Sequence, residues 1–134
     1  MKIRSATLAD EAAVTALWNE CGLTVAANDP VADFRFALGK PNSDILVTDD
    51  GCGTVMVGHD GHRGWLYYLA VAPARQRKGV GRMLVGAAEQ WLAARGVPKV
   101  QLMVRETNEA VAAFYRRLGF EAMPRINFQK RLKT

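Results

Sequence analysis

The sequence predicts a mixed α/β (α+β) layered domain, and two kinds of pattern carry that prediction. Some apolar residues alternate in short runs, as in strands, whereas others recur every three or four residues, as on one face of a helix. Along the chain the expected order is β-α-α-β-β-β-α-β-α-β, with room for one more strand at the end, and strands dominate the middle. The 134 residues, 49% of them hydrophobic, suit one domain spanning 1–134.

Turn and capping residues divide the first half of the chain. Thr7 and Asp10 have the spacing of a capping box, which predicts a helix start, and Gly22 predicts the end of that helix. Residues 28–30, Asn-Asp-Pro, predict the start of a second short helix. The Asp-Asp-Gly turn signal at 49–51 joins two strands of a hairpin. The strands expected here are 2–6, 45–47, 55–57 and 65–72.

The second half begins with a helical pattern from Gly79, which Gly96 is expected to end. Residues 100–104 alternate and predict another strand. Asn108 precedes a further helix, with Gly119 at its end. After it, an alternating apolar segment predicts a last strand, which is also a candidate surface for a homodimer; its apolar residues are Ile126 and Phe128.

The net charge of +5 favours an anionic partner, such as a phosphorylated cofactor, a nucleic acid or a membrane surface. No nucleic-acid motif and no basic strand face with interleaved aromatics accompanies it, so we expect no nucleic-acid partner. No apolar run reaches the roughly 18 residues of a membrane span, and the N-terminus lacks a signal-peptide core. We therefore expect a cytoplasmic protein that does not associate with membranes.

Metal binding is not predicted. Cys21 and Cys52 form no CxxC pair, and His59 and His62 lack a third ligand nearby. The two thiols are expected to be reduced and partly buried.

The most informative segment is a basic, glycine-bearing loop between a strand and a helix. Pro73 ends the strand, and Gly79 and Gly81 open the helix. The first helical turn offers N–H groups without intrahelical partners and the positive end of the helix dipole, and glycines let a phosphate approach the backbone. The segment is neither a Walker A loop nor a dinucleotide fingerprint. It predicts an anion site with added charge from Arg75, Arg77, Lys78 and Arg82.

Two signatures resemble the GNAT N-acetyltransferase superfamily. Residues 76–81, Gln-Arg-Lys-Gly-Val-Gly, are similar to its [RQ]xxGx[GA] pyrophosphate loop, and 69–73 resemble the strand before it. Residues 108–120 resemble its N-x-x-A-x-x-[LF]-Y-x-x-x-G-F segment, with Val111 where alanine is usual. The resemblance implies a mostly antiparallel central sheet flanked by about four helices, with a V-shaped split between the fourth and fifth strands.

The same resemblance implies which residues bind acetyl-CoA. Backbone N–H groups of the loop would hold the pyrophosphate, and the preceding strand would pair with the pantetheine arm. Tyr115 matches the tyrosine that protonates the departing thiolate, a role suited to a phenol with a pKa of about 10. The implied cofactor-binding residues are Leu69, Ala70, Val71, Gln76, Arg77, Lys78, Gly79, Val80, Gly81, Arg82, Asn108 and Tyr115.

The expected reaction is direct attack of a neutral amine on the thioester, with a backbone N–H near 69–71 stabilising the tetrahedral oxyanion. Tyr67 stands where many family members have a glutamate base. Glu106, Tyr67, Tyr68 or a water chain therefore remain candidates for the base. The acceptor is open among peptide N-termini, lysine, polyamines, amino sugars and antibiotics, with residues 28–29 and 60–63 as candidate flanking groups. Alternatives are a non-catalytic acyl-CoA-binding or sensing domain and a small nucleic-acid-binding domain.

Overall fold

The computed structural model describes residues 1–133. These residues fall into two compact units, Met1–Met103 and the segment that begins at Val104, and each is described by itself below. The expectation of a single domain over 1–134 stays a prediction.

The first unit is built on a five-stranded mixed sheet in the order β1-β2-β3-β4-β5. Neighbours from β1 to β4 run antiparallel, whereas β4 and β5 run parallel. This confirms the predicted mixed, mostly antiparallel sheet. The strands are β1 Ile3–Ser5, β2 Ser43–Thr48, β3 Gly53–His59, β4 Gly64–Val71 and β5 Val100–Gln101.

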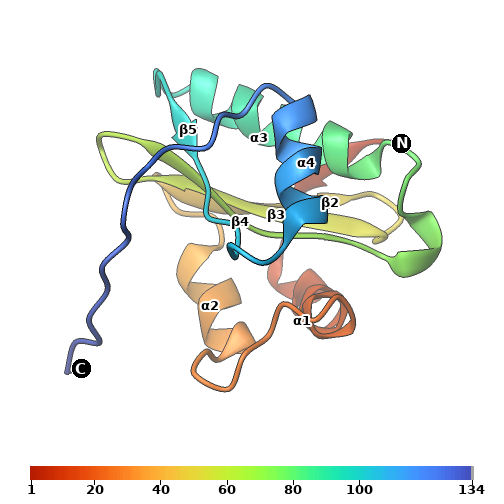
Figure 1. Ribbon diagram of the computed structural model, residues 1–134. Helices are drawn as coiled ribbons and strands as arrows, with labels where there is room; N and C mark the ends of the chain where they lie inside the picture. The colour runs from red at the N-terminus through yellow and green to blue at the C-terminus, as the bar shows by residue number, and fades with distance from the viewer. Residues whose placement is uncertain (134) are drawn as a thin grey trace. The chain divides into compact units, whose positions relative to one another are not determined.

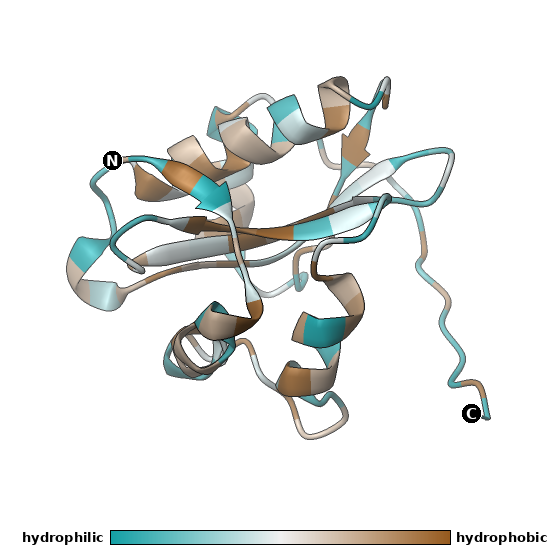
Figure 2. Ribbon diagram, turned by 180° about the vertical axis from the view of Figure 1, so that it is seen from behind, coloured by the Kyte–Doolittle hydropathy of each residue, from teal (hydrophilic) through white to brown (hydrophobic). Residues whose placement is uncertain are grey.

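Helices cover both faces of this sheet. Figure 1 shows α1 (Glu11–Glu20) and α2 (Pro30–Ala37) on one face and α3 (Val80–Ala93) on the other. Figure 2 shows hydrophobic residues along the middle strands, between the two helical layers. On the α1 and α2 face, Trp18 and Phe34 are fully buried against the sheet, and Leu84 is fully buried on the α3 side. Burying apolar surface on both faces stabilises the sheet between its helices.

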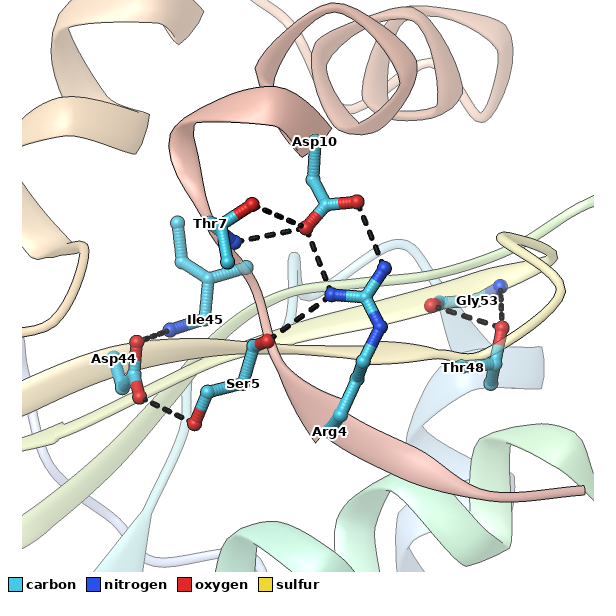
Figure 3. A network of polar contacts seen from close by, with 8 residues as sticks. All are labelled: Arg4, Ser5, Thr7, Asp10, Asp44, Ile45, Thr48 and Gly53. Carbon is cyan, nitrogen blue, oxygen red and sulfur yellow. Dashed lines mark hydrogen bonds and ion pairs between the residues drawn. The ribbon is translucent and has the colours of Figure 1, made fainter.

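The predicted capping box forms at Thr7, but it caps a short 3-10 helix, η1 (Leu8–Asp10), and α1 follows at Glu11. An Asp10 carboxylate oxygen accepts the Thr7 N–H at 2.8 Å, and the same carboxylate binds the Arg4 guanidinium at 2.8 and 2.9 Å (Figure 3). The Arg4 hydrogen bonds hold the pKa of Asp10 well below its usual range. Asp29 caps α2 by accepting from Val31 N and Ala32 N, and Gly22 follows α1 in the left-handed region at φ 71°.

Gly53 and Gly86 differ in the space available for a side chain between α3 and its surroundings. A Cβ at Gly53 would lie 2.8 Å from Leu84 Cδ1 and 3.0 Å from Val80 Cγ1, whereas a Cβ at Gly86 would meet no atom within 4 Å. We expect Gly53→Ala to lower the free energy of unfolding by about 1–3 kcal/mol through overpacking. Gly86→Ala, inside α3, should raise it by about 0.5–1 kcal/mol. Urea unfolding of both variants measures this, and equal midpoints would contradict it.

The predicted strand at 100–104 is too long, because β5 ends at Gln101. Its pairing with β4 consists of Gly64 with Val100 and Trp65 with Gln101. Beyond those pairs the two strands share no hydrogen-bonded ladder. The apolar residues after Gln101 still alternate as in a strand, but their backbone does not pair with β4. The early end of this pairing agrees with the predicted split between the fourth and fifth strands.

The second unit contains one helix among its described residues, α4 (Glu109–Arg117), which confirms the predicted helix after Asn108. The predicted last strand is wrong. Residues 119–133 have no strand, and Ile126 and Phe128 are 81% and 89% exposed. An alternating apolar pattern becomes a strand by pairing with a neighbour, and the described residues of this unit contain no other strand.

Candidate active site

The predicted anion-binding loop lies between β4 and α3, as expected. It passes through a short 3-10 helix, η2 (Pro73–Arg75), and then takes two left-handed residues, Arg77 at φ 64° and Gly79 at φ 83°. Gly79 is the N-cap of α3 and provides no side chain to bond the first-turn N–H groups. Left-handed residues within a turn direct successive amides to one side, which makes a concavity for an anion. The backbone from Gln76 to Arg82 is therefore suited to hold a diphosphate.

The cations of this loop differ in their partners. Arg75 makes an ion pair with Asp50 at 3.0 Å, and Asp50 also accepts from Thr48 Oγ1 and from Cys52 N. Arg75 therefore fixes the start of the loop against the β2–β3 turn. The three other cations are exposed, and no ion pair joins them to a carboxylate within residues 1–133; they are Arg77, Lys78 and Arg82.

Gln76 has a role that the motif did not reveal. Its side-chain Nε2 donates to the Val71 carbonyl at 3.0 Å, which ties the loop back to the end of β4. The Cys21 thiol donates to the same carbonyl at 3.3 Å. These contacts hold the junction of β4 with the loop, while the backbone N–H of Gln76 keeps its predicted role as an anion donor.

A β-bulge interrupts β4 within the predicted pantetheine-binding strand. Thr54 pairs with Ala70 and Met56 with Tyr67, so the single Val55 faces both Tyr68 and Leu69. Tyr68 has φ 52°, a left-handed value that is unusual for a tyrosine. A bulge leaves the extra residue out of the ladder and bends its strand. On its other side, β4 pairs with β5 only at Gly64 and Trp65, so the rest of β4 has main-chain groups that no strand among residues 1–133 pairs with on the β5 side.

Tyr68 packs toward α1 and α2. Its ring stacks on Trp18 at 3.9 Å between centroids, and its hydroxyl donates to Asp33 Oδ2 at 2.6 Å. Burial, with the Asp33 carboxylate as a second cause, raises the pKa of Tyr68 well above its ordinary value. Tyr67 is 42% exposed, and burial of part of its ring raises its pKa as well. Both phenols are therefore protonated near neutral pH, which argues against either acting as the base.

In the second unit, Tyr115 is buried on α4 at 8% exposure. Its ring makes edge contacts with Phe114 at 5.1 Å and Phe120 at 5.5 Å. Burial raises the pKa of Tyr115 to about 12, so the phenol keeps its proton across the physiological range. A protonated phenol is the form that a general acid needs.

The other predicted residues of this unit are exposed. Asn108 caps α4, since its side-chain oxygen accepts the Val111 N–H at 3.2 Å. Glu106 lies in an exposed turn before the helix. The structure thus gives Asn108 a local structural role, and the functional roles of both residues stay predictions.

The candidate acceptor-flanking acids both serve local structure. Asp29 caps α2, and Asp60 accepts from His62 N, Arg63 N and Trp65 Nε1. These hydrogen bonds, that of Arg63 N first, lower the pKa of Asp60 to about 2.

Among residues 1–133 no three His, Cys, Asp or Glu side chains gather as a metal would require. None of the described helices has the length and hydropathy of a bilayer crossing.

Known proteins resemble this chain in sequence and in fold. The model of the acetyltransferase (GNAT) family matches residues 11–120. Acetyltransferase ECA0875 of Pectobacterium atrosepticum is 41% identical over 135 residues, which cover 98% of this chain and 96% of the relative.

Two solved structures share the fold. Aminoglycoside N-acetyltransferase AAC(6')-Iy, solved in complex with CoA, has a TM-score of 0.82 at 18% identity, over 97% of this chain and 93% of the other. A putative acetyltransferase from Agrobacterium tumefaciens has a TM-score of 0.78 at 23% identity, over 98% and 100%. With the glycine-opened helix after a bulged strand, these similarities lead to one conclusion: the chain belongs to the GNAT acetyltransferase family.

Proposed function

We propose that this acetyltransferase moves the acetyl group of acetyl-CoA to a primary amine by direct attack through a tetrahedral intermediate. The observation that carries the proposal is the N-terminus of α3, where an uncapped first turn follows two left-handed residues and lies among exposed cations. A diphosphate suits this arrangement, since backbone N–H groups and the helix dipole both favour a bound anion.

The space around the loop fits a bulky phosphate. A Cβ placed at Gly79 would meet no atom within 4 Å, so the surface above this backbone is open. Backbone amides from Gln76 to Arg82 would bind the diphosphate oxygens of CoA. Exposed Arg77, Lys78 and Arg82 would add charge around it.

The pantetheine arm and the thioester would lie along β4. Leu69, Ala70 and Val71 follow the bulge, on the part of the strand that β5 does not pair. The amide groups of the pantetheine arm can hydrogen-bond to these main-chain groups in the same way as an additional strand would. A bulge amide aimed at the thioester carbonyl would stabilise the oxyanion, and one such donor supplies about 3 kcal/mol.

Proton transfer completes the reaction. The neutral amine nitrogen bonds to the thioester carbon, the tetrahedral intermediate collapses, the C–S bond breaks and the thiolate leaves as CoA. The proton that the nitrogen loses would pass through water to the Tyr115 oxygen, which restores the phenol after it has protonated the thiolate. Tyr115 would donate its proton to that thiolate, whose reference pKa of about 8.5 lies well below the pKa of about 12 for the buried phenol. The transfer therefore draws on the positioning of the phenol in the transition state rather than on its acidity.

The protonation of the acceptor favours some amines over others. At pH 7 about one in ten α-amino groups is neutral, against roughly one in 2,500 lysine-like amines. Tyr67 replaces the family's glutamate, and Glu106 is exposed, so the chain offers no buried carboxylate base at either predicted position. An acceptor with a low amine pKa fits this site best. Aminoglycoside N-acetyltransferase AAC(6')-Iy shares this fold, so amino sugars are a class of acceptor to include.

The same replacement by Tyr67 favours a second candidate, a non-catalytic acyl-CoA-binding or sensing domain on this fold. A homodimer is also proposed, on the exposure of Ile126, Phe128 and Leu132 at 81%, 89% and 73%. Exposed apolar side chains in one segment are typical of an interaction surface.

Calorimetry with acetyl-CoA, followed by a thiol-release assay with amines of graded pKa, tests the proposal. We expect micromolar to submillimolar binding and turnover that is faster for α-amino groups and amino sugars than for lysine-like amines. Binding without release of CoA thiol for any amine would favour the sensing domain. Absence of binding at millimolar acetyl-CoA would overturn both.

A further inference from the structure

We infer that Tyr68 and Asp33 form a positioning pair, which holds the β4 bulge in the geometry that the acetyl transfer requires. Neither residue belongs to the family's motifs in this chain. The inference rests on the proposed function, since it concerns the backbone that would face the thioester. Its basis is a strained backbone position whose side chain is fixed from a different element.

The strain is at Tyr68 itself. A non-glycine residue in the left-handed region is unfavourable and persists where the surroundings determine its conformation. Two contacts do so here. The ring lies nearly parallel to Trp18, with an interplanar angle of 13°, and the hydroxyl reaches Asp33 Oδ2 at 2.6 Å. Both partners lie more than 30 residues away in the chain, so tertiary structure sets this conformation.

The position of Asp33 is fixed by a backbone hydrogen bond within α2 and by the packing of α2 against the core. The Asp33 N–H bonds the Asp29 carbonyl at 2.9 Å, and its neighbour Phe34 is fully buried in the core. Hydrogen bonds to an ionised acceptor are shorter and about twice as strong as neutral ones. The Tyr68 hydroxyl therefore links the bulge to a helix that does not itself belong to the sheet.

Asp33 differs from the nearby acids Asp10 and Glu11 in the kind of partner that its carboxylate has. Asp10 pairs with Arg4 and Glu11 with Arg35, both at ion-pair distance. Within residues 1–133 no such pair involves Asp33, and its carboxylate accepts a hydrogen bond from the neutral phenol of Tyr68 instead. A half-buried carboxylate directed at one hydroxyl orients that hydroxyl strongly, since a buried charge needs its hydrogen bond.

The consequence for the reaction lies in the backbone, not in the phenol. Because Val55 faces two residues of β4, the conformation at Tyr68 decides where the N–H groups of the bulge and of Leu69 point. A donor helps the oxyanion when it lies within hydrogen-bond distance of the place where the charge develops. Removing the hydrogen bond between Tyr68 and Asp33 should thus lower kcat. The affinity for acetyl-CoA should not change, because the proposed diphosphate site lies at the N-terminus of α3.

The test compares Tyr68→Phe, which keeps the stacked ring, with Asp33→Ala, Asp33→Asn and the double variant Tyr68→Phe/Asp33→Ala. We expect Tyr68→Phe and Asp33→Ala each to lower kcat about tenfold or more, with the dissociation constant for acetyl-CoA within twofold. The double variant should be no worse than either single variant, since both remove one interaction. Asp33→Asn keeps an acceptor oxygen and should recover most of the rate. Arg35→Gln, two residues along α2, removes the pair with Glu11 and is the matched control with unchanged kcat.

The outcomes separate this inference from the proposed function. If wild-type protein binds acetyl-CoA and releases CoA, but Tyr68→Phe keeps kcat within twofold, the positioning pair is refuted and the function stands. Losses that multiply in the double variant, or a loss equally large in Arg35→Gln, would also refute it. If the wild type shows no turnover, the proposed acetyl transfer is refuted. The positioning role of Tyr68 and Asp33 is then tested by hydrogen exchange, and unchanged protection of the Leu69 amide in Tyr68→Phe would refute it.

Discussion

Replacing Tyr115 by phenylalanine is expected to lower kcat by roughly 10²- to 10⁴-fold, the range that general acid catalysis contributes. The ring and its edge contacts with Phe114 and Phe120 are kept, so the fold of α4 should not change. Since the proposed diphosphate site lies at the N-terminus of α3, the dissociation constant for acetyl-CoA should stay within about twofold. Steady-state kinetics beside calorimetry measures the two effects separately.

The pH dependence gives an independent check on the same residue. A general acid works while it holds its proton, so activity falls as pH rises through the pKa of that acid. Because the pKa of Tyr115 is raised to about 12, wild-type kcat should show no descending limb below about pH 11 from this group. Turnover of Tyr115→Phe equal to that of the wild type, or a wild-type descending limb near pH 8, would remove the phenol from the mechanism. Phe114→Leu, which keeps the hydroxyl of its neighbour, is the matched control.

Replacing Gly79 by aspartate is expected to weaken acetyl-CoA binding by about 100-fold. A carboxylate about 5 Å from a bound phosphate charge costs about 3 kcal/mol at an effective dielectric of 20, and each 1.4 kcal/mol is tenfold in affinity. Asp and Asn tolerate the left-handed region better than other side chains, so at φ 83° the backbone strain is kept small. Titration calorimetry at low salt measures the loss, which should shrink as salt screens the repulsion.

Two matched variants isolate the charge. Gly79→Asn has the same size and strain without the charge, and we expect it to bind within about fivefold of wild type. Gly96→Asp places the same carboxylate at another exposed left-handed glycine, φ 75°, at the far end of α3. That variant should bind normally. Equal losses for Gly79→Asp and Gly79→Asn would mean that the backbone, rather than an anion site, had been disturbed.

Local signals in the sequence predicted most of the elements correctly. Helix starts depend on side chains near in sequence, such as Thr7 with Asp10 and Asp29 with its own first turn, so spacing alone predicts them. The position of the loop before α3 could be predicted for the same reason, since Gly79 both opens α3 and stands in a short motif. Comparison with known proteins then confirmed the family that the two signatures had indicated.

What could not be predicted depends on partners distant in sequence. No residue type marks the bulge, because a tyrosine and not a glycine takes the left-handed position. Its anchor, Asp33, is 35 residues away on α2. Ile126 and Phe128 have a strand-like pattern, but no strand lies beside them within the described part of their unit, so the pattern alone predicts a strand that does not form. Register, pairing and distant contacts are properties of the assembled sheet.

The bulge in β4 also bears on the solubility of this fold. A strand whose outer main-chain groups lack a neighbour is a template on which a strand of another molecule can assemble, the first step of edge-to-edge aggregation. Natural proteins blunt such edges by twisting them, and a bulge does so without adding charge. Under the proposed function, the bulge at Tyr68 would leave β4 open to the slender pantetheine arm while presenting a poor surface to a straight polypeptide strand.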